Sequence, residues 1–253
     1  MLRRNIPSVI AVAAFLVVWQ LACVIELIPS YMLPSPIAVV KAFYADLPLL
    51  WEHSLITLQE AFVGLLLGVA TGFIMAILMD TFNVLYKMFY PLLVITQTIP
   101  SVAIAPLLVL WFGYEMSPKI ILIVLSTFFP VTVGVLEGFR GADKDAVNLL
   151  RSMGAGRWQI FCHIKFPSAL PQFFSGLKIA TAYSVVGAVI SEWLGGFGGL
   201  GVYMTRVKKA FAFDKMFAVI FLISAISLGL MALLGFVEKK CMPYHKINEE
   251  TKR

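Results

Sequence analysis

The amino-acid sequence predicts an all-α protein that crosses a membrane several times. Hydrophobic residues make up 60% of the 253 residues, charged residues make up only 13%, and the mean hydropathy is +0.90. A soluble domain carries roughly 25% charged residues. Several apolar stretches have the length of about 20 residues that a helix needs to cross a bilayer. We therefore expect a single transmembrane domain over residues 1–253, with about six membrane-spanning helices.

The first apolar stretch, 6–27, follows two arginines and is predicted to be a retained membrane helix. Such a beginning also resembles a cleaved signal, and Cys23 leaves a lipoprotein signal as an alternative. Gln20 stands where lipoprotein signals usually carry an aliphatic residue, and many more spans follow. The proline-rich segment 29–36 should end this helix, and 37–51 is expected to lie at a membrane surface.

The next two apolar stretches differ in their helix-breaking residues. In the predicted second span, 58–79, Gly64, Gly68 and Gly72 recur at four-residue intervals and lie near one helix face. Small residues on one face let membrane helices approach closely, so we expect helix packing there rather than a ligand site. The third stretch, 88–112, contains three prolines and should be kinked or interrupted.

Three further spans complete the predicted bundle, at 120–136, 173–194 and 216–237. The longest polar break, 137–172, separates the fourth span from the fifth. Its two halves have helical spacing of apolar residues around a Gly-Ala-Gly turn at 154–156. A glycine-rich loop with basic residues joins the last two spans.

The basic residues predict the orientation of the bundle. With the amino terminus in the cytoplasm, six spans place 14 of the 20 Lys and Arg residues on the cytoplasmic side, whereas the opposite orientation leaves only six there. The positive-inside rule therefore predicts that both termini are cytoplasmic. The basic residues form no continuous stripe, so no nucleic-acid partner is expected. The three cysteines and three histidines lack metal-ligand spacing, and no metal site is predicted.

The most specific motif lies in the polar segment between the fourth and fifth spans. Gly154 is followed ten residues later by Ile164-Lys165-Phe166-Pro167, within the string RSMGAGRWQIFCHIKFPSALP. This segment resembles the EAA loop of binding-protein-dependent ABC importer permeases. The family pattern is Glu-Ala-Ala, three residues, Gly, nine residues and Ile-x-Leu-Pro. Here Asn148, Leu149 and Leu150 replace Glu-Ala-Ala, and Phe166 replaces Leu, whereas the Gly-to-Pro spacing is kept.

The resemblance covers most of the chain, including LPSP at 33–36, QTIPSVAIAPLLVLWFG and SGLKIATAYSVVGAVISEWLGG. It implies the type I ABC importer permease fold, in the nitrate, sulfonate and taurine branch, closest to permeases for thiamine precursors such as hydroxymethylpyrimidine. In that family the loop, here about 140–171, docks in a cleft of the ATP-binding subunit and transmits its closure. The residues that the resemblance assigns to this coupling loop are Gly154, Ala155, Arg157, Trp158, Phe161, Ile164 and Pro167.

The same resemblance implies the partners of the chain. Because no GxxxxGK[ST] phosphate loop occurs in the sequence, we expect no bound cofactor and no enzyme activity of its own. ATP and Mg²⁺ would be used by a separate ABC ATP-binding subunit, present in two copies. A second copy of this chain, an extracytoplasmic substrate-binding protein and membrane lipid are the other expected partners. The expected location is the bacterial plasma (inner) membrane.

A solute path needs polar groups that face the bundle interior. Pro100 should free backbone carbonyls beside polar side chains in the third span, and the fifth span carries several hydroxyls. Each hydroxyl can instead bond to its own helix. Glu192 is an embedded ionisable residue, but its position near the outer end fits an interfacial structural role equally well. The candidate path residues are Gln97, Thr98, Ser101, Thr181, Tyr183, Ser184 and Glu192.

The sequence thus predicts the permease subunit of an ATP-driven importer, with hydroxymethylpyrimidine as the first candidate solute. Sulfonate, taurine and nitrate are alternatives within the same class. An ion-coupled secondary transporter is the alternative from another class, but it would place ionisable residues near the bilayer midplane, where they are scarce here. A membrane enzyme is a third possibility, and paired carboxylates or a nucleophile motif that would support it are missing from the spans.

Overall fold

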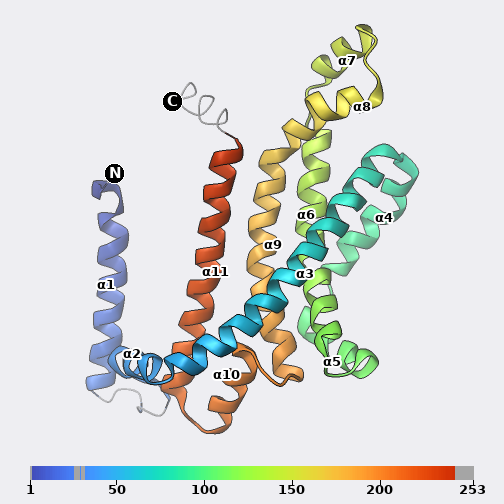
Figure 1. Cartoon of the computed structure of the whole chain (residues 1–253). Helices are drawn as coiled ribbons and strands as arrows, with labels where there is room; N and C mark the ends of the chain where they lie inside the picture. Colours follow the sequence, from blue (N-terminus) through green and yellow to red (C-terminus); the bar gives the residue numbers. More distant parts are fainter. Residues whose placement is uncertain (1, 26–28, 30–31, 243–253) are drawn as a thin grey trace.

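The structure is a computed structural model that describes residues 2–25, 29 and 32–242. Every regular element within these residues is helical, which confirms the predicted all-α fold class. The helices in chain order are α1 (Leu2–Val24), α2 (Pro36–Ala45), α3 (Leu47–Thr81), α4 (Asn83–Thr96), α5 (Ser101–Phe112), α6 (Met116–Arg140), α7 (Lys144–Ser152), α8 (Arg157–Ile160), the π-helical turn η1 (Phe161–Lys165), α9 (Phe166–Leu194), α10 (Leu200–Lys209) and α11 (Phe213–Cys241) (Figure 1).

Four helices are long and apolar enough to cross a membrane: α3, α6, the continuous helix Arg157–Leu194 and α11. Helices α4 and α5 satisfy the same criteria together but bend by 98° at the short break between them. This bend confirms the predicted interruption of the third span. The apolar part of α1, Ile10–Val24, is shorter than a span. By length and composition the described residues give four spans, or five with the bent pair, so a count of six is not confirmed.

Two predicted boundaries are wrong because polar residues and proline do not end a helix that tertiary contacts support. Helix α3 begins at Leu47 instead of residue 58, which limits α2 to Pro36–Ala45. The polar residues of the added turns find partners elsewhere in the fold, as described below. The chain also continues as helix through Pro167, because the π-helical turn η1 directly before the proline accommodates its missing N–H. The predicted loop before α11 contains α10.

Helices α3, α6 and α9 form the core of the bundle. The glycines on one face of α3 lie against α6: a Cβ on Gly68 would stand 2.0 Å from Thr127 Oγ1, and one on Gly72 would stand 2.8 Å from the Phe128 carbonyl oxygen. This confirms that the glycine face permits close helix packing. Gly176 of α9 approaches the backbone of α6 in the same way.

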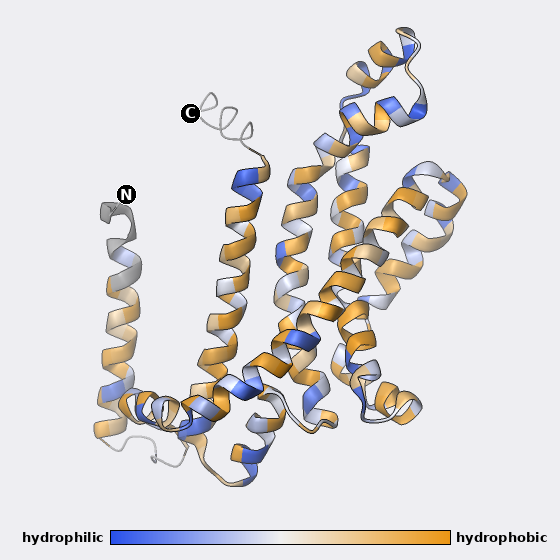
Figure 2. Cartoon of the chain, viewed as in Figure 1, coloured by the Kyte–Doolittle hydropathy of each residue, from blue (hydrophilic) through white to orange (hydrophobic). Residues whose placement is uncertain are grey.

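The two ends of the bundle carry different hydrophilic segments. Figure 2 shows apolar residues along the long helices and hydrophilic residues concentrated in α7, α8 and α10. The hairpin formed by α7, α8 and η1, residues 144–165, is named the arm, and its end of the bundle is the arm end. The start of α1 and the end of α11 also lie toward the arm end (Figure 1). Helices α2, α5 and α10 lie at the opposite end, named the α10 end.

Asp46, in the turn between α2 and α3, ties helices together at the α10 end. The Tyr203 hydroxyl donates to Asp46 Oδ2 at 2.6 Å, and Lys215 Nζ lies 2.8 Å from the same oxygen. Burial raises the pKa of Asp46, but the hydrogen bonds from Lys215 and Tyr203 oppose it more strongly. The pKa of Asp46 therefore lies below its ordinary value.

The substitution Asp46→Asn is expected to lower stability at neutral pH and to reduce its dependence on acid. A carboxyl with a lowered folded-state pKa stabilises the fold above its unfolded-state pKa of about 3.9, and this contribution is lost as the pH falls through the folded-state pKa. Thermal unfolding from about pH 7 down to about pH 3 measures the difference. Tyr203→Phe, which keeps the carboxylate and its ion pair with Lys215, is the matched control and should retain more of the acid dependence than Asp46→Asn does. Equal acid dependence in Asp46→Asn and the parent protein would contradict this role.

Candidate functional site

The arm is a helical hairpin that projects beyond the bundle (Figure 1). Asp143 caps the start of α7 by accepting a hydrogen bond from the backbone N–H two residues on, at 2.8 Å. At the other end of α7, the Gly154 N–H donates to the Arg151 carbonyl at 3.1 Å and the Ala155 N–H donates to the Leu150 carbonyl at 3.0 Å. Gly154 has φ +83°, a conformation that favours glycine. Gly154 therefore forms the turn between the two halves of the arm.

Large apolar side chains on the arm are exposed to solvent. The exposed fraction is 74% for Trp158 and for Met153, and 63% for Leu149. The Trp158 ring stacks on Phe161 with 5.6 Å between ring centroids, and Phe161 in turn lies 5.3 Å from Phe139 of α6. Exposed apolar groups clustered on a hydrophilic segment are typical of a protein docking surface. The exposed Trp158 is thus connected through Phe161 to Phe139 of α6.

The arm continues directly into the bundle. Residues Arg157–Leu194 form one helix of 38 residues, made of α8, η1 and α9. Lys165 Nζ forms an ion pair with Asp80 of α3 at 2.7 Å, which fixes the base of the arm. A continuous helix of this kind can carry rigid-body motion from the arm into the bundle. Of the other residues predicted for the coupling loop, Arg157 and Pro167 are exposed, and Ala155, Phe161 and Ile164 are half-buried.

A cavity of about 290 Å³ lies at the break between α4 and α5, bounded by α6 and α9. It is named the chamber. Three of the predicted path residues, Gln97, Ser101 and Tyr183, line it together with Ser126. The chamber has twelve lining residues, and none of them carries a charge. The chamber therefore offers a solute one aromatic ring, one amide and several hydroxyl groups on an otherwise apolar wall.

The other four predicted path residues do not line the chamber. Thr98 is exposed, and its hydroxyl donates to the carbonyl three residues earlier at 2.8 Å. Thr181 and Ser184 are buried, and their hydroxyls bond to carbonyls of α9 at 2.8 Å each. These contacts match the alternative in which a hydroxyl satisfies its own helix. Glu192 lies at the α10 end, in a separate group of polar residues.

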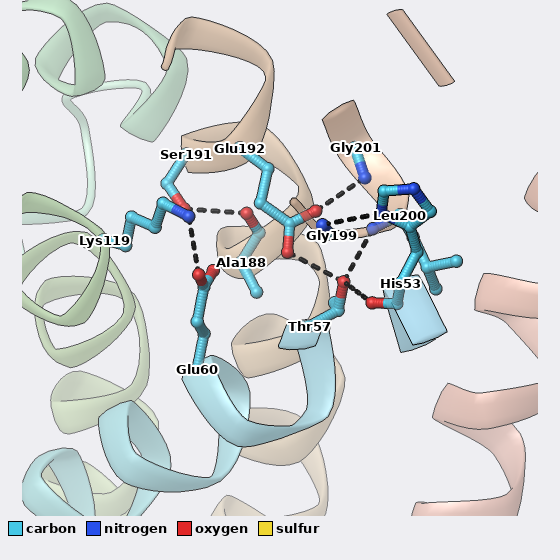
Figure 3. Close-up of polar contacts among 10 residues, drawn as sticks. All are labelled: His53, Thr57, Glu60, Lys119, Ala188, Ser191, Glu192, Gly199, Leu200 and Gly201. Carbon is cyan, nitrogen blue, oxygen red and sulfur yellow. Dashed lines mark hydrogen bonds and ion pairs between the residues drawn. The ribbon is translucent and has the colours of Figure 1, made fainter. Parts of the chain in front are cut away.

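This second group, named the buried cluster, joins α3, α6, α9 and the start of α10 (Figure 3). The exposed fraction is 1% for Glu192 and Thr57, 5% for Glu60 and 6% for Lys119. Lys119 Nζ donates to Glu60 Oε1 at 2.5 Å. Glu192 Oε1 lies 2.7 Å from Thr57 Oγ1, and Glu192 Oε2 accepts a hydrogen bond from the Gly201 N–H at 2.6 Å. The cluster therefore contains two carboxyl groups and one lysine.

The buried cluster also caps the start of α10. The first backbone N–H groups of a helix have no partner within the helix. Here the Gly199 N–H donates to His53 Nδ1 at 2.9 Å, and the Leu200 N–H donates to Thr57 Oγ1 at 2.8 Å. Gly199 has φ +112°, and a Cβ at this position would stand 2.2 Å from the carboxyl carbon of Glu192. Side chains of α3 and α9 thus replace a local cap, and only glycine fits at the contact.

Glu60 and Lys119 are absent from the sites predicted from the sequence, although ionisable residues inside apolar spans signal function. The predicted second and fourth spans begin at residues 58 and 120, which puts both side chains near span ends. The structure starts the helices earlier, at Leu47 and Met116, so both residues lie inside them. Breaking a buried ion pair by removing one partner costs about 3–5 kcal/mol. The pair is therefore an important structural contact of the α10 end.

An all-α chain with several apolar spans and a hydrophilic, projecting arm defines a multi-pass membrane protein. Residues 68–242 match the family described as the binding-protein-dependent transport system inner membrane component. A probable ABC transporter permease protein of Haemophilus influenzae is 38% identical over 227 residues, which cover 90% of this chain and 93% of the relative. The formylaminopyrimidine transport permease protein ThiX of Halalkalibacterium halodurans is 36% identical over 232 residues, which cover 91% and 92%.

The chain therefore belongs to the family of inner-membrane components of binding-protein-dependent transport systems. It is a permease component of an ABC importer, in the branch that includes sulfonate, taurine and nitrate permeases, as expected from the sequence. A chain from the crystal structure of an amino acid ABC transporter with histidines has a similar fold, with a TM-score of 0.67 at 15% sequence identity. The superposition covers 78% of this chain and 96% of the other chain. Permeases of this family work with ATP-binding subunits and substrate-binding proteins.

Proposed function

We propose that this chain imports a small neutral pyrimidine, with the thiamine precursor hydroxymethylpyrimidine as the first candidate. Two copies of the chain form the path, and two copies of a separate ATPase bind ATP and Mg²⁺ and drive transport. A substrate-binding protein delivers the solute from outside. The arm and both termini face the cytoplasm, as the distribution of basic residues favours.

The exposed arm is the observation that carries this proposal. It presents Trp158, Met153 and Leu149 to a partner at the end of the bundle where the ATPase binds in the proposed orientation. The arm continues into α9, and α9 contributes Tyr183 to the chamber. Closure of the paired ATPase subunits on the arm therefore reaches the solute path through one helix.

The lining of the chamber supports a neutral solute over an anion. A sulfonate or nitrate ion that loses its hydration needs charged or multiple hydrogen-bond donors in return, and the chamber supplies no Lys or Arg. The Gln97 amide and the hydroxyls of Ser101 and Ser126 suit the ring nitrogens and substituents of a pyrimidine, beside the ring of Tyr183. The volume of about 290 Å³ lies near the lower limit of pockets for small organic ligands, about 300 Å³. The relation to a formylaminopyrimidine permease points to the same class.

Uptake by proteoliposomes that contain the chain, its ATPase and its binding protein tests the function. We expect labelled hydroxymethylpyrimidine to accumulate only when ATP is hydrolysed, and an ATPase variant that binds ATP without hydrolysing it is the control. Accumulation of taurine or nitrate in place of the pyrimidine would contradict the proposed solute, but it would still support an ABC importer. Pyrimidine uptake that follows an ion gradient without ATP hydrolysis would support the secondary-transporter alternative.

The substitution Gln97→Leu is expected to lower pyrimidine uptake by about two- to thirteenfold, because it removes hydrogen bonding worth about 0.5–1.5 kcal/mol. ATP hydrolysis and protein stability should change little, since Gln97 is exposed in the single chain. Thr98→Val is the matched control, because Thr98 is the next residue and lies outside the chamber lining. An equal loss of uptake in both variants would count against the chamber as the site of solute contact.

A further inference from the structure

The buried cluster has two carboxyl groups and one lysine, and we propose that it is a proton-binding site in which Glu192 holds one proton. The bound proton makes the cluster neutral. The protonated carboxyl then joins α3 and α9 to the start of α10. Figure 3 shows Lys119 reaching Glu60, while the Glu192 carboxyl points toward Thr57 and the first residues of α10.

The lysine is paired with Glu60 and not with Glu192. Lys119 Nζ lies 2.5 Å from Glu60 Oε1, and both side chains are at least nine-tenths buried. The second oxygen of Glu60, Oε2, has no hydrogen-bond partner among the described residues, so Lys119 is the group that compensates this charge. The Glu192 carboxyl makes hydrogen bonds with two neutral groups, the Thr57 hydroxyl and the Gly201 N–H, and its other polar neighbour is the acidic side chain of Glu60. Glu192 therefore has no cation bonded directly to it, because Lys119 is bonded to Glu60.

The other ionisable groups around the cluster do not supply that cation. His53 Nδ1 accepts the Gly199 N–H at 2.9 Å, and because both nitrogens of a charged imidazole are donors, this ring is neutral. On α10, Arg206 is exposed and donates to the Phe197 carbonyl at 3.3 Å. The Tyr203 ring, 5.7 Å from His53, and the exposed Glu52 bring no positive charge.

The hydrogen bonds around Thr57 are all satisfied when Glu192 is protonated. Thr57 Oγ1 accepts the Leu200 N–H at 2.8 Å and also lies 3.2 Å from the His53 carbonyl oxygen and 2.7 Å from Glu192 Oε1. A hydroxyl has one hydrogen to give to these two oxygens. A proton on Glu192 Oε1 resolves the conflict, because Glu192 then donates to Thr57 and Thr57 donates to the His53 carbonyl.

The start of α10 favours a negative charge on Glu192, but the loss of hydration and the nearby charge of Glu60 disfavour it more strongly. The partial positive charge at a helix N-terminus offers a modest stabilisation. An ionised carboxyl without a cation in a site that is 1% exposed loses its hydration, and Glu60 adds a second negative charge to the same cluster. Binding one proton removes both penalties and keeps the hydrogen bond from Gly201.

Infrared spectroscopy of the purified full chain tests the proton directly. A protonated carboxyl has a C=O stretching band that ionised carboxylates lack. We expect this band at neutral pH in the parent protein and its loss in Glu192→Gln. Glu52→Gln, an exposed glutamate on the same helix as Glu60, is the control and should keep the band. Absence of the band from the parent protein, or its loss in Glu60→Gln with retention in Glu192→Gln, would overturn the proposal.

Thermal unfolding of the same variants gives a second readout. Glutamine reproduces the protonated form of Glu192, since its amide donates to Thr57 and its carbonyl accepts from Gly201. We therefore expect the unfolding midpoint of Glu192→Gln to stay within about 2 °C of the parent, whereas Glu60→Gln leaves Lys119 unpaired and should lower it by about 6 °C or more. A Glu192→Gln variant that is less stable than Glu60→Gln, or that fails to fold when Glu60→Gln folds, would also overturn the proposal.

Discussion

Gly176→Ala is expected to lower the free energy of unfolding by about 1–3 kcal/mol, because it forces α6 and α9 apart. A Cβ at this position would stand 2.4 Å from the Pro130 carbonyl oxygen and 3.5 Å from the Val131 Cα. Both atoms belong to the backbone of α6, so no side-chain rotation relieves the contact. Because α6 and α9 line the chamber and α9 continues into the arm, we expect uptake to fall together with stability.

Gly229→Ala on α11 is the matched control for this substitution. Nothing lies within 4 Å of a Cβ built on Gly229, and alanine is the better helix former by about 1 kcal/mol. This variant should therefore be as stable as the parent or slightly more stable. Denaturant or thermal unfolding of detergent-purified protein measures both variants. Equal stability of the two alanine variants would contradict the close contact between α6 and α9.

Gly154→Val is expected to reduce ATP-driven uptake by more than about tenfold while the bundle stays folded. The residue has φ +83°, and a β-branched side chain in that conformation costs about 1–3 kcal/mol. Nothing lies within 4 Å of a Cβ at Gly154, so the effect comes from the backbone conformation and not from a clash. The turn should change shape and move Trp158 and Met153 away from the ATPase. Continued ATP hydrolysis without uptake is the expected signature of this uncoupling.

Two variants separate uncoupling from general strain. Gly154→Asn should retain most uptake, because asparagine adopts positive φ more readily than other residues do. Gly113→Val places the same side chain at φ +80° with nothing within 4 Å, in the turn between α5 and α6. It should reduce uptake much less than Gly154→Val does. Normal uptake by well-expressed Gly154→Val would count against the arm as a coupling element, and an equal loss in Gly113→Val would attribute the effect to strain.

The features that the sequence predicted correctly depend on local chemistry. Apolar stretches of span length predict membrane helices wherever they occur, and the prolines of 88–112 predict the break that bends α4 against α5 by 98°. The glycines at four-residue spacing on α3 predict a packing face, and α6 occupies it. Each of these features is readable from a few neighbouring residues, because helix propensity, proline geometry and glycine size act over one or two turns.

The predicted path residues also differ in whether local sequence or tertiary packing determines their position. Gln97 and Ser101 adjoin a local break, and the chamber includes them, whereas the orientation of Thr181 and Ser184 depends on which face of α9 packs against its neighbours. Hydroxyls at similar spacing look alike in a sequence. Tertiary packing alone separates Tyr183, which faces the chamber, from the two buried hydroxyls.

The sequence by itself determined the all-α membrane fold, the interrupted third span and the glycine turn of the arm. Only the tertiary structure decided where α3 begins and what Glu192 does. The polar residues His53 and Thr57 remain in the helix because their partners lie 146 and 143 residues away along the chain, and Glu192 meets Thr57 across 135 residues. A buried polar group is stable only with a partner, and a partner so distant in sequence is chosen by the packing of the whole bundle.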